Sequence, residues 1–186
     1  MSSSGTVGAD EGFRLFLGFR LPDPAAQAIV AWERDQLSAD RVRTVPAENL
    51  HVTIAFLGSR PAGEVGAIAE ALRAAVDGVA KPVLTPVWYR ETRSVGMLVF
   101  GDAEGRAARI AEDAHRRLER LGVYEPESRK WLPHVTVVRF RERPRFQPSI
   151  PDLGPVTMSD AAVYMSRLRP DGAQYEVLES VPLGGG

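Results

Sequence analysis

The sequence predicts an α+β fold built largely from antiparallel sheets, and three observations lead to that prediction. Segments in which apolar residues alternate with a period of two indicate strands, and segments with apolar residues at helical spacing indicate helices. The two kinds are mixed without strict alternation, and several of the short links are polar turns that join neighbouring strands. We expect one domain at residues 13–183, preceded by a disordered Ser- and Gly-rich lead-in at residues 1–12.

The first half of the chain contains two strand–helix pairs. Residues 13–21 alternate in the manner of a strand, and Asp23 followed by Pro24 then marks the start of a helix that reaches about residue 38. Residues 50–57 form a second alternating strand, which we expect to end before the next glycine and proline. Helical spacing follows over residues 62–76.

The second half adds two hairpins, a helix and a further strand. A polar turn joins two strands, the next segment is strongly amphipathic, and a Pro-Asp-Gly turn closes the final hairpin. The expected strands are residues 83–89, 95–100, 132–140, 158–168 and 174–182, and the expected helix is 104–121.

Composition excludes disordered, collagenous and membrane-spanning classes of protein. The chain has 186 residues, of which 44% are hydrophobic and 25% charged. A chain of this length buries about 70% of the surface that its unfolded form exposes, so it needs no disulfide or structural metal to fold. Its net charge of -1 gives no bulk attraction to polyanions, which must therefore be recognised locally. It has no cysteine, no signal-peptide pattern and no long apolar run. We expect a cytoplasmic monomer that has no membrane partner.

The most informative feature is a repeated tetrapeptide. Two of the three histidines begin the segments His51-Val52-Thr53-Ile54 and His134-Val135-Thr136-Val137, each inside an expected strand. A period of two places the histidine and threonine of each segment on one face, and the aliphatic residues on the other. If the strands lie side by side across a pseudo-two-fold axis, two imidazoles and two hydroxyls converge on one cleft.

This set of groups suits a phosphodiester substrate. In-line displacement at phosphorus places the attacking and leaving oxygens on opposite sides, so one imidazole can accept a proton from water while an imidazolium protonates the leaving oxygen. The threonine hydroxyls can donate to the non-bridging oxygens. A zinc site would need three or four ligands, and no cysteine or third histidine lies near the pair. We therefore expect no metal and no cofactor.

The paired motifs resemble those of the two-histidine (2H) phosphoesterase superfamily, and within it the bacterial and archaeal RNA 2',3'-cyclic phosphodiesterases, also named 2'-5' RNA ligases. The resemblance extends over RLFLGFRLP (14–22), NLHVTIAFLG (49–58), WLPHVTVVRF (131–140) and YMSRLRPDGAQYEVL (164–178). It implies a bilobal fold in which two pseudo-symmetric antiparallel sheets, flanked by helices, enclose a central cleft. It also implies metal-independent opening of 2',3'-cyclic phosphate ends of RNA or oligonucleotides to 2'-phosphates, with 2'-5' ligation as the reverse reaction.

The resemblance further implies roles for individual residues. His51 resembles the family's proton donor to the leaving 3'-oxygen, and His134 resembles the acceptor that activates water. Phe56 and Arg139, five positions after each histidine, resemble residues that contact the base and the phosphate. Strict alternation would turn both away from the cleft, so their use requires a bulge or a strand end that re-aims them.

Other interpretations stay open at this point. A single strand histidine is more often structural than catalytic, and His115, on the polar side of its helix, is expected to be solvated. The arginine run over residues 139–145 suits either an RNA backbone or a solvated strand edge. The alternative functions are a nucleotide- or RNA-binding module without turnover, and a phosphodiesterase acting on a small substrate such as ADP-ribose cyclic phosphate. We expect Phe13, Phe16, Phe19 and Trp32 in the core, and Tyr164 and Tyr175 in cross-strand packing.

Overall fold

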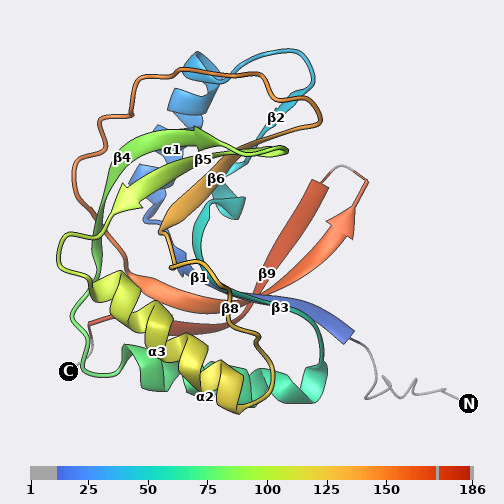
Figure 1. Ribbon diagram of the computed structural model, residues 1–186, viewed down its shortest axis with the longest axis vertical. Coiled ribbons are helices and arrows are strands. Elements are labelled where there is room, and N and C mark those ends of the chain that lie inside the picture. The colour runs from blue at the N-terminus through green and yellow to red at the C-terminus, as the bar shows by residue number, and fades with distance from the viewer. Residues whose placement is uncertain (1–11, 171, 185–186) are drawn as a thin grey trace, which may run out of the picture.

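A computed structural model describes residues 12–170 and 172–184 (Figure 1). Of the expected lead-in, residues 1–11 lie outside the described residues, and Gly12 is the first residue of a strand. The helices are α1 (Asp23–Gln36), α2 (Val65–Val76) and α3 (Arg106–Arg120), with short 3-10 helices η1 (Ala47–Asn49) and η2 (Ala62–Glu64). The strands are β1 (Gly12–Arg20), β2 (Val42–Thr44), β3 (His51–Pro61), β4 (Val83–Glu91), β5 (Val95–Gly101), β6 (His134–Phe140), β7 (Val156–Thr157), β8 (Asp160–Arg169) and β9 (Gly172–Pro182).

The strands form a curled antiparallel sheet in two halves, as the predicted α+β class requires. The strand order is β7-β4-β5-β6-β3-β1-β8-β9, with β2 paired on β6. One half contains β4, β5 and β6, and the other contains β3, β1, β8 and β9 (Figure 1). The halves meet where β3 pairs with β6, so the two expected sheets are continuous across one seam.

Helices cover the outer side of each half. The pair α2 and α3 lies below the β3-β1-β8-β9 half, where α2 contacts β8 and β9 and α3 contacts β3 (Figure 1). Helix α1 lies above the other half and contacts β2 and β6. The aliphatic side chains of the repeat, such as Val52 and Val135, are fully buried in the main core beneath these helices. The histidine side of the seam is therefore the face that none of the helices within the described residues covers.

The same bulge occurs in both repeat strands. Against β1, the register of β3 passes from Thr53 to Ala55 and leaves out Ile54. Against β5, the register of β6 passes from Thr136 to Val138 and leaves out Val137, the equivalent residue. Two consecutive residues then face the core, which moves the residues that follow directly to the other face.

Two features differ from the expected elements. Strand β3 continues to Pro61 instead of ending before Gly58, because Gly58 adopts a φ of 69° at a second bulge and the strand resumes beyond it. Strands β2 and β7 were not predicted from the sequence, since segments of three and two residues are too short to show alternation. Of these, β2 proves important because it places arginines beside β6.

Candidate active site

The seam between β3 and β6 brings the two repeats together. Val52 pairs with Val135 in an antiparallel ladder, so His51 lies across from Thr136 and His134 lies across from Thr53. These four side chains share one face and are all partly buried. Diagonal neighbours of this kind are about 7–8 Å apart, which leaves room for a phosphate group between the two imidazoles.

Both histidines are held in the same tautomer by the same local contact. Nδ1 of His51 is 2.8 Å from the carbonyl oxygen of Asn49, and Nδ1 of His134 is 2.9 Å from that of Leu132. A carbonyl oxygen only accepts, so Nδ1 carries the proton and donates in each case. Nε2, on the opposite edge of each ring, then carries a lone pair that can accept a proton.

An aromatic cluster surrounds His51 and makes the site asymmetric. The ring centroid of His51 lies 4.7 Å from that of Phe16, 5.7 Å from Tyr164 and 5.3 Å from Tyr175. Phe16 and Tyr164 are buried in a small cluster separate from the main core, and Tyr175 packs against them.

These contacts revise the expectations for three aromatic residues. Phe19 and Trp32 are buried in the main core and Phe13 packs against it, but Phe16 faces the site. Tyr164 and Tyr175 do pack across the hairpin, and their packing also encloses His51. One indication of this was present in the sequence: Phe16 is apolar, but alternation places it on the strand face opposite the predicted core face.

Gly18 provides the space that the His51 ring occupies. A Cβ at this position would lie 3.2 Å from Cδ2 of His51 and 3.2 Å from the carbonyl oxygen of Val52. Such contacts are tighter than an ordinary van der Waals approach, so a side chain here would displace the imidazole. Gly18 thus belongs to the site, although the sequence indicated only that it lies opposite the core face.

The pKa of His51 is lowered from its ordinary value to about 4. Burial is the main cause, because it penalises the charged imidazolium; the positive charge of Arg139 and the neighbouring His134 add to it. The hydrogen bond to the Asn49 carbonyl acts in the opposite direction. In the ligand-free protein at neutral pH, His51 is therefore neutral.

The two bulges turn Phe56 and Arg139 toward the histidine face. Both side chains are exposed, and the ring of Phe56 is 66% accessible, with its centroid 6.0 Å from that of Phe16. The bulge that strict alternation required is thus present in each strand. The structure places these two residues together with the four repeat residues on one surface.

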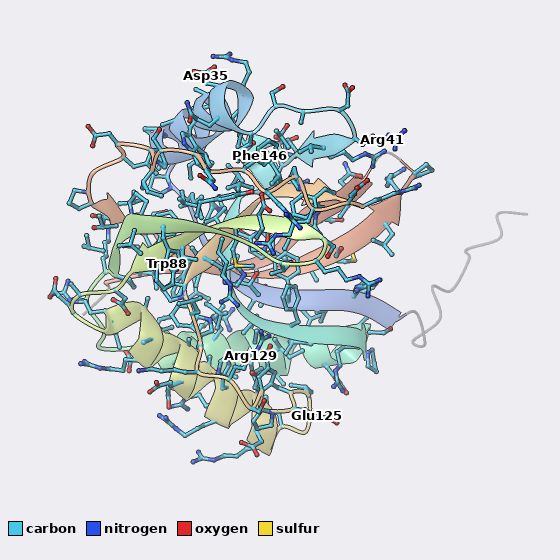
Figure 2. The ribbon with its side chains drawn as sticks, turned by 45° about the horizontal axis from the view of Figure 1, so that its top comes forward. Asp35, Arg41, Trp88, Glu125, Arg129 and Phe146 are labelled. Atoms are coloured by element: carbon cyan, nitrogen blue, oxygen red, sulfur yellow. The ribbon has the colours of Figure 1, made fainter. Side chains whose placement is uncertain are left out.

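A pocket opens beside Thr53 and His134. It has a volume of about 380 Å³ and lies toward the α3 side of the seam, where Arg129 is seen in Figure 2. Aromatic and cationic side chains line it, including Phe56, Tyr124, Trp131, Arg129 and Lys130. Nε1 of Trp131 donates to the carbonyl oxygen of Thr53 over 3.0 Å and so ties the segment before β6 to β3.

His115 was expected to be solvated, and this expectation is wrong. It is partly buried, and its Nε2 lies 2.7 Å from the carbonyl oxygen of Ile54, the residue left out of the ladder at the bulge. Its ring stacks on Tyr124 with centroids 4.7 Å apart. His115 therefore joins α3 to the bulge, a role that depends on a contact 61 residues away in the chain.

In the part of the chain that the structure describes, no cluster of three or more His, Cys, Asp or Glu is arranged to hold a metal ion. No helix within residues 12–170 and 172–184 is both long and apolar enough to cross a membrane.

Sequence and structure comparisons agree with this arrangement. The family profile described as LigT like Phosphoesterase matches residues 20–85. The RNA 2',3'-cyclic phosphodiesterase of Methanocaldococcus jannaschii is 24% identical over 178 residues, which cover 89% of this chain and 98% of that protein. The Thermus thermophilus protein of the same name is 29% identical and covers 92% and 91%. The fold matches that of E. coli LigT complexed with NADP+ with a TM-score of 0.81 at 21% identity, over 94% of this chain and 100% of that one.

A curled antiparallel sheet that carries two His-x-Thr strands on its uncovered face defines a two-histidine phosphoesterase. The relatives align over nearly the full chain, and the fold match is equally complete. The chain belongs to the LigT-like phosphoesterase family, as the resemblance of the motifs implied.

Proposed function

We propose that this phosphoesterase hydrolyses 2',3'-cyclic phosphate ends of RNA or oligonucleotides to 2'-phosphomonoesters without a metal ion. The observation that carries the proposal is the matched orientation of His51 and His134, each with Nδ1 on a backbone carbonyl and Nε2 free. The relatives named RNA 2',3'-cyclic phosphodiesterase support this choice of substrate.

In the proposed reaction, His134 accepts a proton from water through Nε2 as the water oxygen attacks phosphorus. The bond between phosphorus and the 3'-oxygen breaks, and His51 gives its Nε2 proton to that oxygen. The products are a 3'-hydroxyl and a 2'-phosphate, and the proton must return from His134 to His51 through solvent before the next turnover. The same ring opening with a 5'-hydroxyl as the attacking group in place of water breaks the bond between phosphorus and the 3'-oxygen and forms a 2'-5' bond.

The lowered pKa of His51 requires that its proton arrive with the substrate. The phosphodiester carries a negative charge, which offsets the charge of Arg139 and favours the imidazolium form. Thr53 and Thr136 lie across from the two histidines and donate to the non-bridging oxygens. The exposed ring of Phe56 provides a surface on which the terminal base stacks.

The direct test is incubation with 2',3'-cyclic AMP in the presence of EDTA, followed by identification of the product. The expected product is 2'-AMP, at an undiminished rate in EDTA. Binding of the nucleotide without turnover would instead support a binding module. Faster turnover of ADP-ribose cyclic phosphate than of cyclic RNA ends would assign the small-substrate alternative, and a 3'-phosphate product would contradict the proposed leaving group.

A further inference from the structure

A second concave surface adjoins the candidate active site at the β2–β6 edge. It is a cavity of about 690 Å³, and its size is within the usual range of ligand sites. Residues from β2, β6 and the β8–β9 hairpin line it: Arg41, Val42, Arg43, Arg139, Phe140, Arg141, Glu142 and Pro170. Arg41 lies beside β2, at the end of the sheet remote from Arg129 (Figure 2). We call this surface the arginine groove.

The ladder between β2 and β6 brings arginines of the two strands together. Arg43 pairs directly with Arg139. Arg41 immediately precedes β2 and Arg141 immediately follows β6, and both line the same cavity. All four arginines line one cavity, so their side chains form an array of positive charge around it. Like charges directly opposite in a sheet destabilise it, and this array therefore favours a bound anion.

The charges of this array are not neutralised within the described part of the chain. None of its four arginines forms an ion pair there, and all four side chains are exposed. Arg143, two residues further on, differs: its Nε donates to Glu91 over 3.0 Å. Among the described residues that line the groove, Glu142 is the one acid beside four arginines.

The backbone at Arg41 is also unusual. Its φ is 65°, in the left-handed region that non-glycine residues rarely adopt because it is strained. Such strain persists where surrounding structure or function requires it, and here it accompanies a side chain that lines the groove.

Arg139 connects the groove to the catalytic groups. It lines the cavity, and its charge acts on His51. A chain of phosphates that leaves the candidate active site past Arg139 therefore enters the array of Arg43, Arg41 and Arg141.

We propose that the arginine groove binds the phosphodiester backbone of the nucleotides that precede the cyclic end, so that an oligonucleotide is a better substrate than a mononucleotide. This proposal rests on the proposed function for the direction of the chain, but the binding of a single strand can be measured without any turnover. Because the contacts are with phosphates, sequence should have little effect on affinity.

The test compares wild type with the double variant Arg41→Gln/Arg141→Gln, which removes two groove charges and leaves Arg139 in place. The matched control is Arg109→Gln/Arg120→Gln, which removes two exposed charges from α3. Binding of a 5'-labelled RNA hexamer with a free 3'-hydroxyl is followed by fluorescence anisotropy at several salt concentrations. Turnover is measured in parallel on a hexamer with a 2',3'-cyclic end and on 2',3'-cyclic AMP.

We expect hexamer affinity to fall about fivefold for each groove arginine removed. The slope of log K against log salt should flatten by about 0.7 for each lost phosphate contact. The kcat/KM for the cyclic hexamer should fall with it, that for 2',3'-cyclic AMP should stay within about twofold, and the α3 control should match wild type.

Equal hexamer affinity in wild type and in the groove variant would overturn the proposal, as would equal losses in the groove and α3 variants. Displacement of the hexamer by tripolyphosphate together with no dependence of affinity on RNA length would assign the groove to a free polyphosphate and overturn it as well. Failure of the proposed function is a separate outcome, seen as no hydrolysis of either cyclic substrate while hexamer binding persists.

Discussion

Val52 of β3 pairs with Val135 of β6 at the seam between the two halves of the sheet. Both side chains are fully buried, so the residues on either side of each valine turn to the opposite, uncovered face. This pairing makes the two His-x-Thr segments neighbours about a pseudo-two-fold axis. The arrangement of the proposed catalytic groups therefore depends on packing in the core beneath them.

Replacing His51 or His134 by Ala should lower turnover of 2',3'-cyclic AMP by at least ~10²-fold, because each variant loses one proton-transfer group. Steady-state kinetics provides the measurement. Urea denaturation is the control, and the midpoint for His134→Ala should stay close to that of wild type. Turnover within tenfold of wild type in either variant would remove that residue from the mechanism.

Replacing Thr53 or Thr136 by Ala should weaken transition-state stabilisation by about 1–3 kcal/mol each, because one donor to the phosphate oxygens is lost. The matched controls are Thr53→Ser and Thr136→Ser, which keep the hydroxyl and should retain most of the activity. A serine variant as slow as the alanine variant would show that the methyl group, and hence packing, is what matters.

The protonation of His51 should change on binding. Its pKa of about 4 in the free protein should rise by at least one unit when 2'-AMP is bound, because the phosphate offsets the charge of Arg139. NMR titration of the imidazole, with and without 2'-AMP, measures both values, and Arg139→Gln is the control that should raise the value in the free protein.

The pH dependence of the rate tests the role of His51. Because kcat/KM reports the free enzyme, an acid with a pKa of about 4 makes kcat/KM fall as pH rises above that value, while kcat persists to higher pH. If kcat/KM instead rises as the pH increases through about 4, His51 is the proton acceptor and not the donor.

His115→Ala should destabilise the protein by about 1–3 kcal/mol, since it removes the hydrogen bond to the Ile54 carbonyl and the stacking on Tyr124. Urea denaturation measures the loss. His115→Gln keeps a donor on a side chain of similar reach and should recover part of the stability. A loss of turnover as large as that of His51→Ala, with stability unchanged, would contradict this structural role.

Glu33 of α1 should make stability fall as pH rises. It is 1% exposed, neither carboxylate oxygen has a hydrogen-bond partner among the described residues, and burial raises its pKa from 4.5 to about 8. The folded protein therefore holds a proton that the unfolded chain releases above about pH 4.5, and this stabilisation is lost progressively up to about pH 8. Glu33→Gln should remove this slope and stabilise the protein at pH 8 by about 1–3 kcal/mol. Parallel pH dependences of the urea midpoint in wild type and Glu33→Gln would contradict it.

Much of the fold followed from local pattern. Apolar residues alternate in β1, β3 and β6 and recur at helical spacing in α2 and α3. These patterns arise because one face of each element is buried, so they can be recognised in the sequence. The bulges are different. The sequence showed that Phe56 and Arg139 could face the site only if a bulge turned them toward it. Which residue each bulge leaves out of the ladder depends on the partner strand, so the sequence could not show it.

The sequence by itself determined the class of fold, the two His-x-Thr repeats and the chemistry that suits them, because residue type and spacing along one strand fix which groups share a face. The tertiary structure alone decided that Tyr164 and Tyr175 enclose His51, that His115 supports the bulge, and that Arg43 faces Arg139. These contacts join residues far apart in the chain. Their physical basis is strand order and register, which arise from burying both halves of the sheet around one core and leave no local trace in the residues themselves.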